Sequence, residues 1–154
     1  MSRSEKDKML AGELYRPGDA EIQADQAATK KWLVHYNASL GLSAAERRVL
    51  LAERFAEVGA GAVVRPPFHC DYGFNIRLGA NAFLNYNSVI LDVVEVSIGE
   101  GAQIGPAVQI LRRGSSARSG AAPCRFRIRP PRADRQIRVD RRRGDCPSRR
   151  QHRR

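Results

Sequence analysis

Residues 78–110 read LGANAFLNYNSVILDVVEVSIGEGAQIGPAVQI, and an aliphatic side chain recurs in this stretch at every sixth position. The series runs through Leu78, Leu84, Ile90 and Val96, slips by two residues, and resumes at Ile98, Ile104 and Ile110. A period of six fits neither an α-helix, with 3.6 residues per turn, nor an alternating strand, with two. It fits a chain that turns a corner every six residues and stacks coil upon coil, with the aliphatic side chains inside. The stretch therefore predicts a parallel β-helix.

Residues 4–58, which precede this pattern, are predicted to be helical. Ser4 and Asp7 have the spacing of a helix N-cap with an acidic partner, and Ser43 and Glu46 have the spacing of a capping box. Asp19 is placed to cap a second helix. We expect the last helix to present Leu50, Leu51, Phe55 and Val58 on one face and to end at Gly59 and Gly61.

The remaining residues divide into a β-type segment, 62–110, and an arginine-rich tail, 111–154. Residues 1–110 hold 11 Lys and Arg against 13 Asp and Glu, a net charge of −2, whereas the tail holds 16 Arg and 3 Asp, a net charge of +13. With so few aliphatic residues the tail cannot bury enough apolar surface to order itself, so we predict disorder there. The expected class is α+β, with helices followed by a truncated β-helix.

Composition excludes several classes of protein. No apolar run approaches 18 residues, and the charged N-terminus lacks the apolar core of a signal peptide. The cysteines Cys70, Cys124 and Cys146 are odd in number and lack metal-ligand spacing, so we expect a reduced cytoplasmic setting and no metal. The tail is basic enough to contact nucleic acid, but Phe126 is its only aromatic residue, which argues against base stacking.

Several motifs, in a fixed order, resemble the maltose and galactoside O-acetyltransferases of the hexapeptide-repeat superfamily, including the nodulation acetyltransferase. They are KMLAGELYRPGD, then His35-Tyr36-Asn37, then PPFHCDYGFNIRLG, then FLNYNSVILDVVEVSIGEGAQIGPAVQI. The resemblance implies a homotrimer of left-handed β-helices with the active site between subunits. It also implies acetyl-CoA in the groove between two prisms, and a histidine that acts as general base on the acceptor hydroxyl.

The resemblance places five residues at the acceptor site, each with a plainer structural role that stays open. Asn85 either holds a sugar hydroxyl or forms a turn amide at a coil corner. Asp19 either binds hydroxyls or caps a helix, and Asp71 and Asp92 either bind the acceptor or close turns. Phe83 either lines the acceptor pocket or packs against its neighbours.

The catalytic histidine of the family is missing, because the matching position is Ser115. His35, His69 and His152 lie elsewhere in the pattern, and the later coils are also absent. Gly114 to Ala117 can be encoded as GGATCATCCGCG, which one base later reads Asp-His-Pro, the expected motif. Residues 141–154 can likewise be encoded so that the same offset gives a sequence containing Pro-Gly-Val-Ser-Ile-Gly. We therefore hypothesise a one-base shift of the reading frame near codon 111.

The resemblance thus implies an acetyl-CoA-dependent O-acetyltransferase acting on a sugar hydroxyl, and the missing histidine predicts that this chain lacks turnover. The open end of the truncated β-helix is expected to expose unpaired strand groups and apolar side chains. Two alternatives remain. The first is a non-catalytic scaffold or interaction protein, and the second is a nucleic-acid binder that uses its arginine tail.

Overall fold

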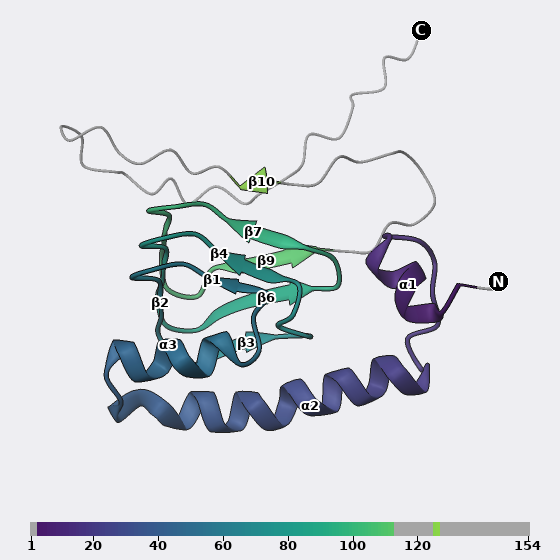
Figure 1. Ribbon diagram of the computed structural model, residues 1–154, viewed down its shortest axis with the longest axis horizontal. Coiled ribbons are helices and arrows are strands. Elements are labelled where there is room, and N and C mark those ends of the chain that lie inside the picture. The colour runs from purple at the N-terminus through teal and green to yellow at the C-terminus, as the bar shows by residue number, and fades with distance from the viewer. Residues whose placement is uncertain (1–2, 113–124, 127–154) are drawn as a thin grey trace, which may run out of the picture.

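The chain forms a helical N-terminal part followed by three stacked coils of parallel strands, a truncated left-handed β-helix (Figure 1). This computed structural model describes residues 3–112 and 125–126. The helices are α1 (Glu5–Leu10), α2 (Ala20–Asn37) and α3 (Ala44–Ala52), with a 3₁₀ turn, η1 (Ala38–Gly41), between α2 and α3. The predicted fold class is confirmed, while the predicted disorder of residues 111–154 lies almost wholly outside the described residues.

All three α-helices begin at the predicted cap residues. The Ser4 hydroxyl accepts a hydrogen bond from the Asp7 N–H at 3.0 Å, and the Asp7 carboxylate accepts from the Ser4 N–H at 3.2 Å. Ser43 and Glu46 form the same reciprocal pair before α3. These bonds satisfy N–H groups that have no partner within the first turn of a helix. The helix starts are therefore set by local sequence.

The predicted end of the last helix is wrong. α3 ends at Ala52, and residues 57 and 58 form the first strand of the β-helix instead of a further helical turn. The Ala56 N–H donates to the Ile76 carbonyl at 3.0 Å, and the Gly59 N–H donates to the Leu78 carbonyl at 2.8 Å. Pairing with the next coil thus overrides the local helical pattern, and β-structure begins before residue 62.

Each of the three coils contributes one short strand to each of three parallel sheets, and residues 125–126 add a fourth strand to the first sheet. The first sheet contains β1 (Glu57–Val58), β4 (Ile76–Leu78), β7 (Val96–Ile98) and β10 (Arg125–Phe126). The second contains β2 (Val63–Val64), β5 (Phe83–Leu84) and β8 (Gln103–Ile104). The third contains β3 (Phe68–Cys70), β6 (Ser88–Asp92) and β9 (Gln109–Arg112).

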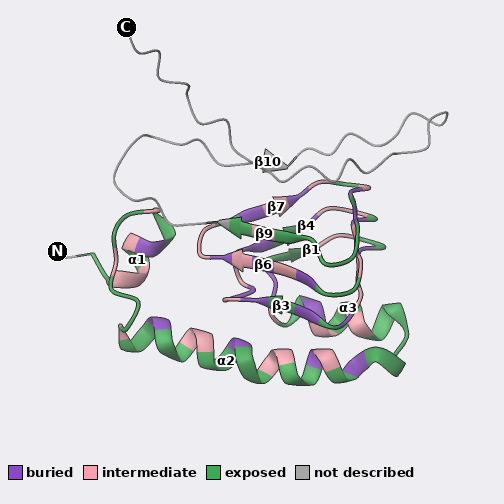
Figure 2. Ribbon diagram, turned by 180° about the vertical axis from the view of Figure 1, so that it is seen from behind, coloured by how far each residue is buried: buried purple, intermediate pink, exposed green. Residues whose placement is uncertain are grey.

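The strand register explains the two-residue slip in the aliphatic pattern. Val58 pairs with Leu78, and Leu78 with Ile98, so that one coil takes twenty residues. Two corners of each coil follow after six residues, while the third follows after eight. Both Val96 and Ile98 are buried, and Figure 2 shows buried positions recurring along the stacked strands. The predicted inward series is confirmed from Leu78 to Ile104, and its last member, Ile110, is partly buried and packs against the core.

Helices α2 and α3 close the first end of the prism, where β1, β2 and β3 lie (Figure 1). Trp32 stacks on Tyr36 with ring centroids 4.9 Å apart, and Phe55 meets Phe68 edge-on at 5.7 Å. Buried aromatic rings of this kind carry a large share of a core's apolar area. The helices therefore cover the apolar interior of the prism at the end where the first coil lies.

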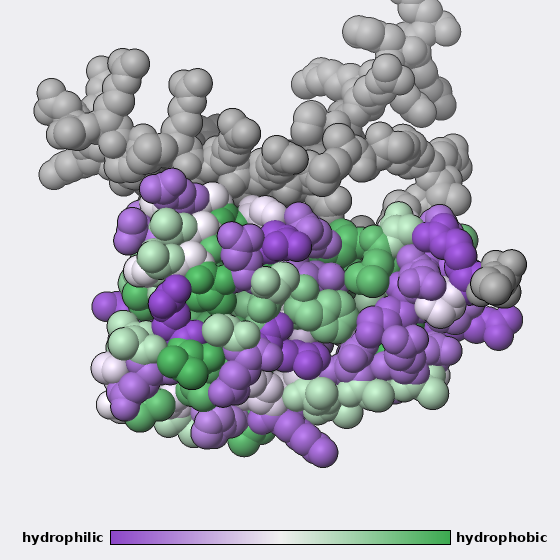
Figure 3. All heavy atoms as spheres, viewed as in Figure 1, coloured by the Kyte–Doolittle hydropathy of each residue, from purple (hydrophilic) through white to green (hydrophobic). Residues whose placement is uncertain are grey.

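At the other end of the prism the apolar side chains are less covered. Val108 is 37% exposed and Ile110 is half-buried, whereas Ser88 and Ile90, at the matching positions of the preceding coil, are buried. Over the described part of the face seen in Figure 3, hydrophilic and hydrophobic side chains are interspersed. Across residues 3–112 and 125–126, none of the helices has both the length and the apolar character that crossing a membrane requires.

Candidate functional site

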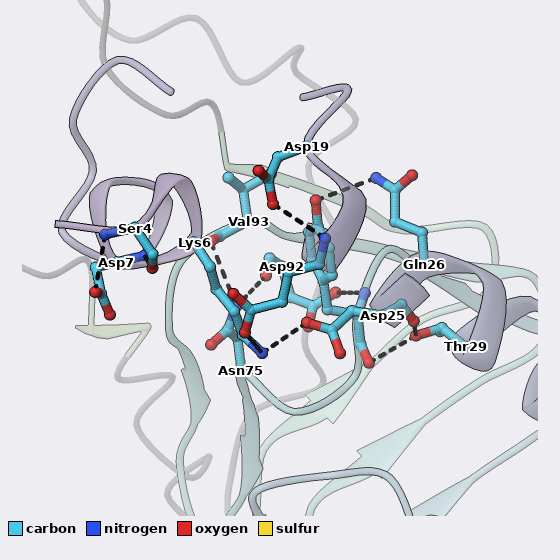
Figure 4. Close-up of polar contacts among 12 residues, drawn as sticks. Ser4, Lys6, Asp7, Asp19, Asp25, Gln26, Thr29, Asn75, Asp92 and Val93 are labelled. Atoms are coloured by element: carbon cyan, nitrogen blue, oxygen red, sulfur yellow. Dashed lines mark hydrogen bonds and ion pairs between the residues drawn. The ribbon is translucent and has the colours of Figure 1, made fainter. Parts of the chain in front are cut away.

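Three of the five predicted site residues gather at one corner of the prism, which we call the Asp corner: Asp19, Asp71 and Asp92. Each is a close neighbour in sequence of a member of one small apolar cluster. The cluster joins the start of α2 to the end of β6 and contains Met9, Ile22 and Tyr72, with Val93 packed against it. Figure 4 shows Asp19, Asp92 and Val93 in the same part of the molecule. Apolar packing thus joins the segments that carry these three aspartates.

The Asp92 side chain anchors the turn that follows β3. Its Oδ1 accepts hydrogen bonds from the N–H groups of Asp71, at 3.0 Å, and Tyr72, at 2.9 Å. The Asn75 side-chain amide donates to the Asp92 main-chain carbonyl at 2.7 Å. The turn role of Asp92 is therefore confirmed, and its second carboxylate oxygen, Oδ2, lies buried without a partner among the described residues.

Burial shifts the pKa values of two carboxyl groups at the Asp corner. It raises the pKa of Asp92 to about 6, although the backbone N–H groups that donate to the carboxylate act in the opposite direction. Burial also raises the pKa of Asp71, which is half-buried. Asp19 accepts a hydrogen bond from the Glu21 N–H at 3.0 Å, so its predicted capping role is confirmed.

The other two predicted residues lie at a second corner, between β5 and β6. Asn85 is half-buried, and its Oδ1 accepts from the Tyr86 N–H at 2.9 Å. The Asn85 main-chain carbonyl accepts from the Ser88 hydroxyl at 2.7 Å. These bonds confirm the turn role of Asn85. Among the described residues its side-chain Nδ2 has no acceptor, so two N–H donors remain for a ligand.

Phe83 faces outward from β5 and is covered by a charged side chain. The Arg65 guanidinium lies 5.1 Å from the centre of the Phe83 ring and 5.0 Å from the centre of the Tyr86 ring. We call the group of Arg65, Phe83, Asn85 and Tyr86 the Asn corner. The predicted packing role of Phe83 is thus confirmed against Arg65. Arg65 and Tyr86 were not among the predicted site residues, although the twenty-residue spacing of Arg65 and Asn85 is visible in the sequence.

The two corners lie at opposite ends of β6. Asn85 precedes this strand and Asp92 ends it, and the strand has five residues. At 3.3 Å per residue, a strand of this length spans about 16 Å. A monosaccharide is shorter than this distance. One subunit therefore does not bring all five predicted residues to one small acceptor.

Neither of the two histidines that the structure describes lies at either corner. His35 lies exposed on α2, and His69 lies exposed on β3. His152 and Ser115 lie outside the described residues. Within the described part of the chain, no group of three or more His, Cys, Asp or Glu side chains is placed to hold a metal ion.

Comparisons with known proteins fit this arrangement. Residues 8–59 match the family model of the maltose acetyltransferase hexapeptide capping motif. Nodulation protein L of Rhizobium meliloti (strain 1021) is 60% identical over 110 residues, which are 71% of this chain and 60% of that protein. The chain thus spans less than two thirds of the length of this relative.

Two solved structures share the fold. A maltose O-acetyltransferase from Clostridium difficile 630 superposes with a TM-score of 0.67 at 34% identity, over 71% of this chain and 58% of that one. A hexapeptide-repeat-containing acetyltransferase from Vibrio cholerae O1 biovar eltor, complexed with acetyl-CoA, superposes with a TM-score of 0.63 at 40% identity. That match covers 70% of this chain and 57% of the other.

Proposed function

The chain belongs to the maltose and galactoside O-acetyltransferase family of hexapeptide-repeat proteins, and from this premise we propose that its site serves acetyl transfer from acetyl-CoA to a sugar-like hydroxyl. The acetyl-CoA complex of the Vibrio cholerae relative supports the choice of donor. The maltose acetyltransferase from Clostridium difficile supports a sugar-like acceptor. We also infer a cytoplasmic protein, a proposal supported by the odd number of cysteines and their lack of metal-ligand spacing.

The separation of the two corners carries this proposal. Each corner holds polar groups that still lack partners, and a five-residue strand keeps them apart within one subunit. Every interface of a rotationally symmetric trimer joins two different patches. We propose that these patches are the Asp corner of one subunit and the Asn corner of the next. The complete acceptor site is then shared between neighbours.

The chemistry of the corners suits a hydroxyl acceptor. The free Nδ2 of Asn85 donates to a sugar oxygen, while Oδ2 of Asp92 accepts from a sugar hydroxyl once the side chains that cover it move aside. The pKa of Asp92, about 6, leaves this carboxylate mostly ionised and able to accept at pH 7. Positioned partners of this kind hold a hydroxyl for attack on the thioester carbonyl.

The proton of the attacking hydroxyl also needs a base. A hydroxyl is a poor nucleophile near neutral pH, and a positioned imidazole contributes typically 10²–10⁴-fold to such a step. No histidine stands at position 115, where the family motif has one. We propose that the chain binds donor and acceptor without turnover, and that the gene carries a frame shift near codon 111.

An acetylation assay tests the proposal. The full chain and a version with one base removed near codon 111 are compared with acetyl-CoA and a panel of glucose, maltose, galactosides and glucuronate. Acetyl transfer is expected from the restored version alone. No transfer by the restored version, or equal transfer by both, would overturn the proposal. Nucleotide sequencing across codons 105–120 tests the frame shift separately.

A further inference from the structure

The Arg65 guanidinium is held in place but has no acceptor for its N–H groups. It lies against the rings of Phe83 and Tyr86, at 5.1 and 5.0 Å from their centres. Its main-chain N–H donates to the Leu84 carbonyl at 2.9 Å, which fixes the backbone. Among the described residues, no hydrogen bond or ion pair occupies the side chain. Its five N–H donors therefore remain for a ligand.

Arg65 lies directly beside the proposed acceptor residue Asn85. The strands β2 and β5 pair in the register Val64 to Leu84, so the residues that follow them occupy equivalent positions in consecutive coils. Tyr86, the next residue along, is 40% exposed and leaves a ring open to solvent. The Asn corner thus presents a cation, an amide and an aromatic ring in one place.

The charge of this corner differs from that of the Asp corner. No acidic residue occurs in 63–67, 83–88 or 103–108, the three segments that build this face. The Asp corner, in contrast, holds three aspartates. A half-buried guanidinium without a carboxylate partner favours a planar anion, because two parallel N–H···O bonds fit a carboxylate well.

We propose that Arg65 is a specificity-determining residue that binds a carboxylate on the acceptor. Phe83 and Tyr86 hold the guanidinium in orientation by cation–π contact. The Tyr86 ring also offers an apolar face to the acceptor. This inference rests on the proposed function, since it names the class of acceptor as one that carries an anionic group near its reacting hydroxyl.

The test uses two sugars that share a ring and differ in one group, glucose and glucuronate. The full chain is labelled at tyrosine, and the ring resonances are followed by NMR during titration with each sugar. Tyr36, which is buried and lies in neither corner, serves as an internal control against general effects of the anion, including its binding to the arginine tail. We expect saturable shifts at Tyr86 with at least tenfold higher affinity for glucuronate.

Two variants complete the test. Arg65→Gln is expected to lose the preference for glucuronate, whereas Arg77→Gln, on the first sheet and paired with Glu57 and Glu95, is expected to keep it. Equal binding of both sugars, or an unchanged preference in Arg65→Gln, would overturn the proposal. So would a change in sedimentation of Arg65→Gln, which assigns Arg65 to a subunit contact.

A final titration uses coenzyme A without a sugar. Shifts at Tyr86 that depend on Arg65 and are produced by coenzyme A would assign the guanidinium to the donor's phosphates and overturn the acceptor assignment. All of these readouts are binding measurements. Their failure is therefore distinguishable from failure of the acetylation assay, which tests the proposed function.

Discussion

At the scale of single residues, Asp92 shows how one side chain combines structural and chemical roles. Its Oδ1 ties down the turn at Asp71 and Tyr72, while Oδ2 lies buried without a partner in the described residues. A carboxylate in this position is costly to ionise, which is why its pKa rises from 3.8 to about 6. The sequence marked Asp92 as a ligand or a turn residue, and spacing alone cannot show that backbone donors occupy one oxygen.

The raised pKa of Asp92 predicts a pH-dependent stability. Because the folded state binds this proton more tightly than the unfolded state, the stabilisation is complete below about pH 4 and is lost as the pH rises through 6. Asp92→Asn removes this effect. We expect the difference in unfolding free energy, variant minus wild type, to rise by on the order of 1–3 kcal/mol between pH 4 and pH 7.

Urea unfolding at a series of pH values measures this difference. Glu100→Gln, which changes an exposed carboxylate in the same coil system, serves as the control and is expected to give a flat difference. A flat difference for Asp92→Asn as well would show that its carboxylate is not desolvated in the folded protein.

Asn37 provides a second prediction at this scale. Its side-chain amide donates to the Phe68 carbonyl at 3.0 Å and accepts from the Phe68 N–H at 2.8 Å. The side chain therefore pairs with the backbone of β3 in the way that a neighbouring strand would. Asn37→Ala leaves both backbone groups without a partner, and we expect a loss of about 2 kcal/mol. His35→Ala, on an exposed position of the same helix, is the matched control. Equal stability of the two variants would argue against this contact.

At the scale of elements, the coil corners depend on the close approach of successive backbones. A Cβ at Gly79 would lie 2.5 Å from the Glu100 amide nitrogen, whereas a Cβ at Gly105 would meet nothing within 4 Å. We expect Gly79→Ala to cost about 1–3 kcal/mol or more, as overpacking does. Gly105→Ala is expected to change stability by less than about 0.5 kcal/mol. Thermal or urea unfolding of the pair distinguishes them, and a Gly79→Ala variant as stable as Gly105→Ala would refute the stacking.

The sequence predicted elements well where local bonds decide them. The caps at Ser4, Asp19 and Ser43 depend on residues three positions away or fewer, so spacing is sufficient. The end of α3 depends on strand pairing with a segment twenty residues later, and a local helical pattern hides it. Arg65 was not predicted as a site residue for the same reason, because its neighbour Asn85 lies one coil further along the chain.

At the scale of the whole molecule, the six-residue period of aliphatic residues was sufficient to predict the prism, since every coil repeats the same inward positions. The site was only partly predictable. Which residues share a corner follows from the twenty-residue register and from the packing of α2 against the end of β6. The central claim, that two corners from neighbouring subunits form one site, concerns an assembly and needs its own measurement.

That measurement is complementation between two variants of the frame-restored chain. Asn85→Ala removes the Asn corner's donor and Asp92→Asn removes the Asp corner's carboxylate, so each variant alone is expected to show little acetyl transfer. Trimers refolded from an equal mixture are expected to recover about one quarter of wild-type activity, because a site is intact only when each neighbour contributes its unaltered corner. A mixture no more active than the separate variants would contradict the shared site.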